Sequence, residues 1–152
     1  MELKNKPLQI SVVGGSDADE ETLSLARSVG RVIAEHGAVL ICGGFGGVME
    51  AAAFGAKEKG GLTVGILSNY KKEKANPFID ITIPSGLGHA RNFLVAASGD
   101  IVIALPGSHG TRSEVSAALL LGKRVVGLRA WQEIQGVHKV ETISQLQDFC
   151  FA

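Results

Sequence analysis

Residues 100–114 read DIVIALPGSHGTRSE, and this stretch decides how the rest of the chain is interpreted. An apolar run typical of a buried strand ends at Pro106-Gly107, and a second glycine leads into an apolar-periodic helix that we expect to begin at Thr111. A strand, a glycine turn and a helix N-terminus in this order form an anion site, because the first helical turn carries unpaired N–H groups and partial positive charge. The residues that we expect to hold a phosphate in this turn are Gly107, Ser108, His109, Gly110 and Thr111.

The same pattern occurs earlier in the chain. Residues 38–47 read AVLICGGFGG and run into a helix that should begin near Val48. The first expected strand also ends in glycines, but it is not followed by the G-x-G-x-x-G fingerprint of classical dinucleotide binding, and no P-loop ending occurs. Glycine loops at several strand ends predict a bound phosphorylated ligand. The further residues expected to contact it are Gly14, Gly15, Ser16, Gly43, Gly44, Gly46 and Gly47.

Apolar runs and amphipathic segments alternate along the whole chain. Strands are expected at residues 8–14, 38–42, 62–67, 79–83, 100–105, 123–128 and 137–140, and helices at 19–36, 48–59, 88–98, 111–121 and 143–149. Such alternation implies a parallel sheet covered on both faces, with ligands at the carboxyl ends of the strands. The sequence therefore predicts an α/β protein, with one Rossmann-like domain over residues 1–152 and a doubly wound parallel sheet of six or seven strands.

Composition excludes several partners. The 152 residues contain 15 Lys and Arg against 15 Asp and Glu, which leaves no basic footprint for nucleic acid or an anionic membrane. The start at residues 1–6 is polar, and no apolar run approaches the roughly 20 residues of a membrane span. We therefore expect a cytoplasmic protein. Cys42, Cys150 and the 4 histidines have no ligand spacing, so no metal site is expected.

Three motifs then agree with one known family. Residues 43–52 (GGFGGVMEAA), 88–92 (GHARN) and 106–114 (PGSHGTRSE) resemble, in order and spacing, the LOG ("Lonely Guy") family. Its members are often mislabelled as lysine decarboxylases, an activity that we do not expect here. The short length and residues 76–80 (NPFID) are most similar to a small bacterial and archaeal branch that also resembles molybdenum cofactor carrier proteins.

The resemblance implies two alternative functions. In the hydrolase members it implies cleavage of the N-glycosidic bond of a nucleoside 5′-monophosphate to base and ribose 5-phosphate, with Arg91 and Glu114 as catalytic residues. The alternative is a non-catalytic carrier of the molybdenum cofactor. Asn92 stands where the hydrolases usually have a lysine, and Ser108 replaces a glycine, so binding is expected more firmly than catalysis. No cofactor is required; the expected ligand is a nucleotide monophosphate, phosphate or a molybdopterin-type molecule.

Glu114 and Arg91 each have a second interpretation. Thr111 and Glu114 also fit a capping box, in which Thr111 caps the helix and Glu114 reaches back to it. Arg91 falls in a first helical turn, where the helix dipole disfavours a cation, so an acidic partner or a phosphate is expected beside it. In the catalytic interpretation, the Arg91 charge should keep Glu114 ionised.

Two further segments indicate contacts beyond the site. Residues 115–121 are apolar almost all round the expected helix, which favours burial against a second subunit in a homodimer or a larger even homo-oligomer. The loop at 68–78 carries the charged run 71–74 and is either a solvated loop or a binding lid.

Overall fold

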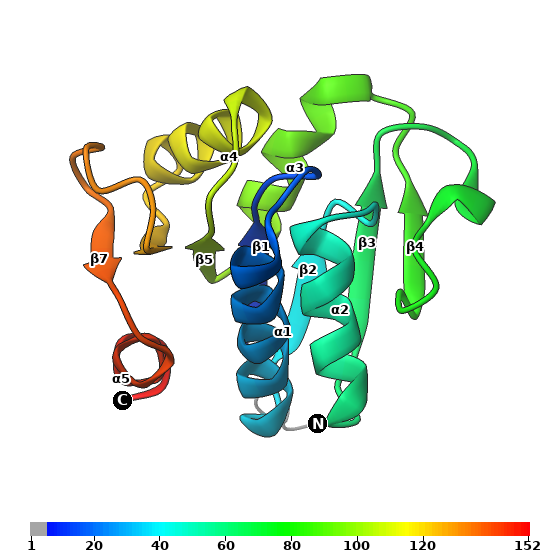
Figure 1. Cartoon of the computed structure of the whole chain (residues 1–152). Coiled ribbons are helices and arrows are strands. Elements are labelled where there is room, and N and C mark those ends of the chain that lie inside the picture. Colours follow the sequence, from blue (N-terminus) through cyan, green and yellow to red (C-terminus); the bar gives the residue numbers. More distant parts are fainter. Residues whose placement is uncertain (1–5) are drawn as a thin grey trace, which may run out of the picture.

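Within residues 6–152, which the computed structural model describes, seven strands form one parallel sheet (Figure 1). The polar start at residues 1–5 lies outside the described residues. The strand order is β4-β3-β2-β1-β5-β6-β7, so the expected α/β fold is confirmed. The strands are β1 (Gln9–Val13), β2 (Val39–Cys42), β3 (Thr63–Leu67), β4 (Ile81–Pro84), β5 (Ile101–Ala104), β6 (Arg124–Leu128) and β7 (His138–Val140).

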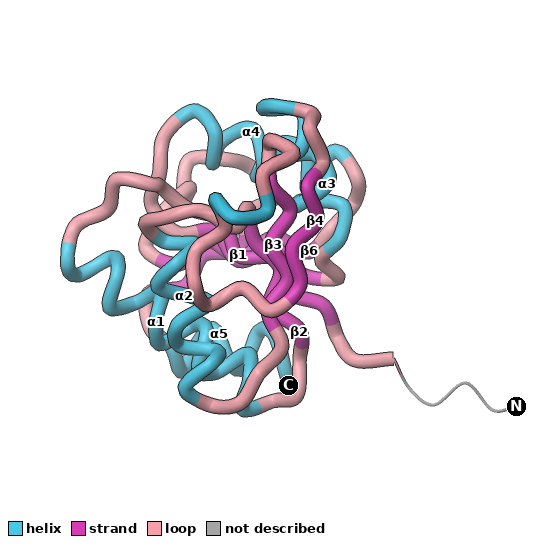
Figure 2. The backbone as a smooth tube through the Cα atoms, turned by 90° about the vertical axis from the view of Figure 1, so that its right-hand side faces the viewer, coloured by secondary structure: helices cyan, strands magenta, loops and turns pink. Residues whose placement is uncertain are grey.

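Helices cover both faces of this sheet, as Figure 2 shows from the side of β4. They are α1 (Glu20–Glu35), α2 (Val48–Glu58), α3 (Arg91–Ser98), α4 (His109–Leu120) and α5 (Ile143–Phe151), with short 3-10 turns η1 (Lys72–Lys74) and η2 (Gly88–Ala90). None of the helices among residues 6–152 is both long and apolar enough to cross a membrane.

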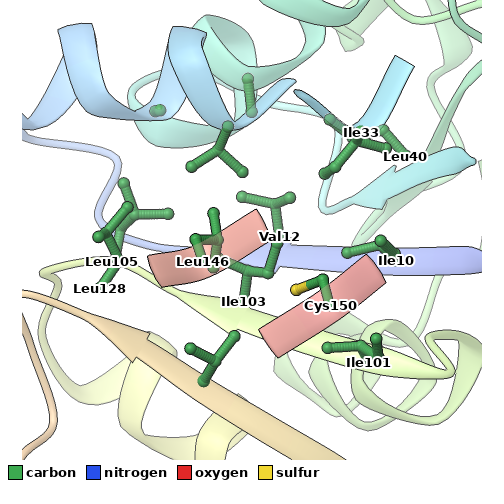
Figure 3. Packing of buried hydrophobic residues seen from close by; sticks show 14 of the residues in the cluster. Ile10, Val12, Ile33, Leu40, Ile101, Ile103, Leu105, Leu128, Leu146 and Cys150 are labelled. Carbon is green, nitrogen blue, oxygen red and sulfur yellow. The ribbon is translucent and has the colours of Figure 1, made fainter. Parts of the chain in front are cut away.

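Strand alternation divides the apolar core into two layers. In β1, Ile10 and Val12 join α1, α2 and α5 in one buried cluster, part of which Figure 3 shows. The next residue, Val13, faces the opposite side and packs with α3 and α4. Because successive strand residues point to opposite faces, one strand supplies both layers. Three helices therefore cover one face and two cover the other.

The loops that follow β1 and β5 meet at the centre of the sheet. β1 pairs with β2 on one side and with β5 on the other. The chain therefore adds β2, β3 and β4 on one side of β1 and then β5, β6 and β7 on the other side. In such sheets the crevice for a ligand lies at this switch point, beyond the carboxyl ends of the strands. The Gly15 N–H group donates to the Pro106 carbonyl at 2.9 Å and joins the two loops.

Helix α1 begins as its sequence predicts, whereas α4 does not. The Asp19 side chain accepts from the Thr22 N–H group at 2.8 Å and caps α1. Helix α4 begins at His109 with Ser108 as its N-cap, two residues before the expected start. Thr111 is thus already inside the helix, and Glu114 is too far along it to reach the cap. The capping-box interpretation of these two residues is therefore wrong.

Two glycines let α1 and α2 approach closely. A Cβ atom at Gly30 would overlap the Ala52 carbonyl oxygen, and one at Gly55 would overlap the carbonyl oxygen of Arg27. The bidentate pairs of Arg27 and Arg31 with Glu58 join the same two helices at their exposed side. This close contact fixes α1 and α2 against each other on one face of the sheet.

Candidate functional site

A cavity of about 420 Å³ lies at the switch point of the sheet. The end of β1, the start of α2, the end of β3 and the first turns of α3 and α4 all contribute to its wall. All of these are segments beyond the carboxyl ends of parallel strands, where the sequence predicted a ligand. The lining residues are Gly14, Gly15, Ser16, Phe45, Met49, Ser68, Gly88, His89, Arg91, Asn92, Ser108, Gly110, Thr111 and Glu114.

The predicted site residues divide between this cavity and its surroundings. Arg91 and Glu114 line it together, with six of the predicted binding residues: Gly14, Gly15, Ser16, Ser108, Gly110 and Thr111. Gly107 and His109 line a neighbouring cavity on the other side of the same turn. The four glycines of the second loop, Gly43, Gly44, Gly46 and Gly47, are not among the lining residues.

The second glycine loop has a visible packing role. A Cβ atom at Gly43 would overlap the Arg91 guanidinium, so this glycine makes room for the arginine. Gly47 has a φ of 68° and is the N-cap of α2. The next residue, Val48, donates its N–H group to the Gly15 carbonyl at 3.0 Å. The loop at 43–47 therefore makes room for Arg91 and leads directly into the hydrogen bond that α2 makes with the first glycine loop, residues 14–16.

Arg91 has one buried hydrogen-bond donor that finds no acceptor among the described residues. It is the first residue of α3, and its Nη1 donates to the Ile66 carbonyl at 3.1 Å. Its Nε is buried and has no hydrogen-bond partner among the described residues. Burial lowers the pKa of the guanidinium, while the nearby Glu114 acts in the opposite direction. A buried donor without a partner is costly, and the charge of the guanidinium at the cavity wall favours an anionic ligand.

Glu114 projects from the second turn of α4 and is 9% exposed. Burial raises the pKa of its carboxyl group to about 8, although the Arg91 charge lowers it in part. The Arg91 charge lowers the pKa of Glu114, as expected, but the desolvation that comes with burial raises it by more. Below that pKa the carboxyl group is neutral and can both donate and accept a hydrogen bond.

The first turn of α4 can hold an anion. The Ser108 side chain makes no cap hydrogen bond, and the N–H groups of residues 108–111 precede the first intrahelical bond, from Arg112 to the Ser108 carbonyl at 2.9 Å. With Glu114 neutral and Arg91 charged, the cavity carries net positive charge beside a positive helix end. Among residues 6–152, no three His, Cys, Asp or Glu side chains gather as a metal site.

Sequence reasoning missed several lining residues. Phe45 and Met49 belong to the 43–52 motif, in which only the glycines were expected to contact a ligand, and Ser68 directly follows β3. His89 belongs to the 88–92 motif, which was the available signal. Asn92 is buried and donates to the Ser113 hydroxyl at 3.2 Å.

The loop at 68–78 is anchored beside this cavity. Asn76 donates through Nδ2 to the Phe45 carbonyl at 2.8 Å, and its N–H group donates to the Gly44 carbonyl at the same distance. The lysines of the run at 71–74 are exposed to solvent, as in a solvated loop. Ser68 is the residue of this loop that lines the cavity.

The raised pKa of Glu114 predicts how stability depends on pH. The folded protein retains a proton that the unfolded chain releases, so the free energy of unfolding should fall as pH rises from about 4.5 to about 8. The slope from this group is at most about 1.4 kcal/mol per pH unit. Glu114→Gln stays neutral, so in urea titrations its stability should exceed that of wild type increasingly from pH 5 to pH 8.

The exposed Glu73→Gln is the control and should leave the wild-type pH slope unchanged. A stability difference between Glu114→Gln and wild type that stays constant over this pH range would contradict the prediction.

Known proteins are similar to this chain in sequence and in fold. The SLOG cluster4 family model matches residues 7–149. An uncharacterized protein of Archaeoglobus fulgidus is 48% identical over 147 residues, which cover 97% of each chain. The molybdenum cofactor binding protein of the phototrophic bacterium Rippkaea orientalis has a TM-score of 0.91 at 36% identity, over 95% of both chains. The molybdenum cofactor carrier protein of Chlamydomonas reinhardtii has a TM-score of 0.86 at 35% identity, over 95% of this chain and 96% of that chain. The resemblance based on the three motifs is thus confirmed, and the chain belongs to the SLOG cluster4 family.

Proposed function

We propose that this protein binds the phosphate ester of a fused-ring molecule, a pterin phosphate of the molybdenum cofactor type, and carries it without turnover. The observation that carries the proposal is the Arg91 guanidinium, a charged group in the wall of the cavity whose Nη1 donates to a neutral carbonyl, that of Ile66. Support also comes from the two solved structures described as molybdenum cofactor binding or carrier proteins, at 36% and 35% identity.

The cavity offers complementary groups for both parts of such a ligand. A phosphate at the first turn of α4 would accept from unpaired N–H groups, and the Arg91 charge would balance its negative charge. The neutral Glu114 carboxyl group would hydrogen-bond to the polar edge of the ring, and Phe45 offers an aromatic face. We expect any metal to arrive as part of this cargo.

A second candidate is hydrolysis of a nucleoside 5′-monophosphate. A carboxyl group whose pKa lies near neutrality, in a cavity beside an arginine, is suited to general acid or base catalysis. Asn92 weighs against it, because this uncharged side chain stands where the hydrolases usually have a lysine and is already bonded to Ser113.

Ligand titrations with a pterin monophosphate and with guanosine 5′-monophosphate (GMP) test the proposal. Pterin and guanine share the same 2-amino-4-oxopyrimidine edge, so GMP also serves as a probe of the cavity. Arg91→Gln should weaken binding about 10- to 100-fold, the value of a charge-assisted hydrogen bond. Arg31→Gln removes the same charge from the exposed side of α1 and should leave the affinity unchanged, while Arg27 still pairs with Glu58.

The proposal would be overturned if the wild-type protein bound neither pterin monophosphate nor GMP. It would also be overturned if Arg91→Gln and Arg31→Gln bound these compounds with equal affinity. Release of free base from GMP would favour the hydrolase instead. In that case Glu114→Gln should reduce turnover by roughly 10²- to 10⁴-fold.

We also infer that a second copy of the chain covers part of the sheet face that carries α3 and α4. Of residues 115–121, only the end of the segment is available for contact with a second subunit. Val115 packs inside its own chain, while Leu120 is 79% exposed. At the β4 edge, Ile83 pairs in register with Ile66, whose side chain belongs to the α3 and α4 layer. Ile83 thus continues that apolar face without a helix over it. The exposed apolar residues on β4, α3 and the end of α4 are Ile81, Ile83, Phe93, Leu94, Leu120 and Leu121.

Sedimentation at micromolar concentration checks this inference. Wild type should sediment as a dimer or a larger even oligomer of the 15.9 kDa chain. Ile83→Lys places a charge on the exposed apolar face and should shift the population toward monomer. Lys139→Glu, which changes an exposed charge on β7 at the opposite edge, should leave the assembly intact. A wild-type monomer would contradict the inference.

A further inference from the structure

A second cavity of about 330 Å³ lies on the other side of the turn that begins α4. Residues 106–109 form one wall, and the segment after β6, which includes Trp131, forms the other. We call it the Trp131 cavity. Ser108 lines both this cavity and the candidate site, so the two are neighbours across one residue, the N-cap of α4.

The Trp131 indole is held firmly in the wall of the Trp131 cavity. The Trp131 Nε1 donates to the Leu105 carbonyl at 2.9 Å, which fixes the indole to the end of β5. Trp131 and Arg129 have φ values of 62° and 56°, and no other non-glycine residue described has a positive φ. Such conformations cost free energy and persist where the surrounding structure imposes them. The indole is 7% exposed and so has little freedom to turn away.

The charged residues of this cavity differ in how firmly they are held. Arg129 is held by two hydrogen bonds: its Nη1 donates to the Glu21 carboxylate and its Nε donates to the Glu141 carbonyl, both at 2.8 Å. Arg112 is not: its Cζ lies 5.3 Å from the centre of the Trp131 ring, and its Nη2 lies 3.4 Å from Glu133. Both side chains of that ion pair are more than half exposed, so the pair is weak. Arg112 can therefore be exchanged onto a ligand phosphate.

We propose that the Trp131 cavity takes the second base of an extended ligand, in which a pyrophosphate crosses Ser108 and joins a nucleoside to the ring held in the candidate site. This inference rests on the proposed function for the first half of the ligand. The bridging phosphates would lie at the unpaired N–H groups of α4, which separate the two cavities. The second base would stack on the indole, and Arg112 would turn from the ring to the bridge.

Three guanine compounds test this inference: GMP, guanosine 5′-diphosphate (GDP) and diguanosine pyrophosphate, in which two guanosines share one 5′–5′ pyrophosphate. The first compound fills one cavity, the second adds only a phosphate, and the third adds the second base. Trp131 is the single tryptophan of the chain, so its fluorescence reports on this cavity. We expect the two-base compound to bind at least 10-fold more tightly than GMP or GDP and to quench Trp131.

Arg112→Gln should remove this advantage and leave the affinity for GMP unchanged. Arg124→Gln is the matched control, because it also removes a guanidinium from an aromatic ring, that of Phe149, at a distance from both cavities. Equal affinity of the two-base compound and GMP, or an equal loss for both in Arg112→Gln, overturns the inference. The proposed function is judged separately, on whether pterin monophosphate binding depends on Arg91.

Discussion

The hydrogen bond from the Gly15 N–H group to the Pro106 carbonyl joins the two loops on which the site depends. The loops approach so closely that a Cβ atom at Gly107 would lie 2.9 Å from the Gly15 nitrogen. Because β1 and β5 are adjacent and parallel, this contact brings the first turn of α4 to the end of β1. The second glycine loop is tied to the same point through Val48 and the Gly15 carbonyl. Arg91, packed against Gly43, is thereby held opposite the start of α4.

The site keeps polar groups in an unfavourable state in the free protein. A buried Arg91 Nε lacks an acceptor, and burial holds Glu114 in its protonated form. Both conditions cost folding free energy. In our proposal, a phosphorylated ligand would pair with the Arg91 guanidinium and hydrogen-bond to Glu114, so that binding would recover part of that cost as affinity. The rest of the core is apolar and well packed, which allows the protein to maintain this arrangement without a ligand.

The sequence predicted the sheet because apolar runs and glycine turns are local signals. It also predicted that a ligand would lie between the glycine loops at 43–47 and 107–111, whereas none of the four glycines at 43–47 lines the cavity. It did not predict where α4 begins, because His109-Gly110 is a poor helix start by propensity and Thr111 is a good cap. The sequence did not reveal the roles of Gly43 and Gly47, because a glycine that makes room for a side chain or for backbone cannot be told by sequence from one that lets a phosphate approach. The pKa of Glu114 depends on burial, which no spacing reveals.

The departure from the hydrolase pattern at Asn92 and the raised pKa of Glu114 are connected in our proposal. A hydrolase needs an ionised carboxylate to stabilise the positive charge that develops on the sugar or to activate water. A lysine at position 92 would add a positive charge next to Arg91 in the cavity wall and lower the pKa of Glu114 toward the ionised form. With Asn92 in its place, that charge is missing, and burial keeps the carboxyl group neutral near pH 7. A neutral hydrogen-bonding group suits a site that recognises a ring and releases it unchanged, which is the chemistry of a carrier.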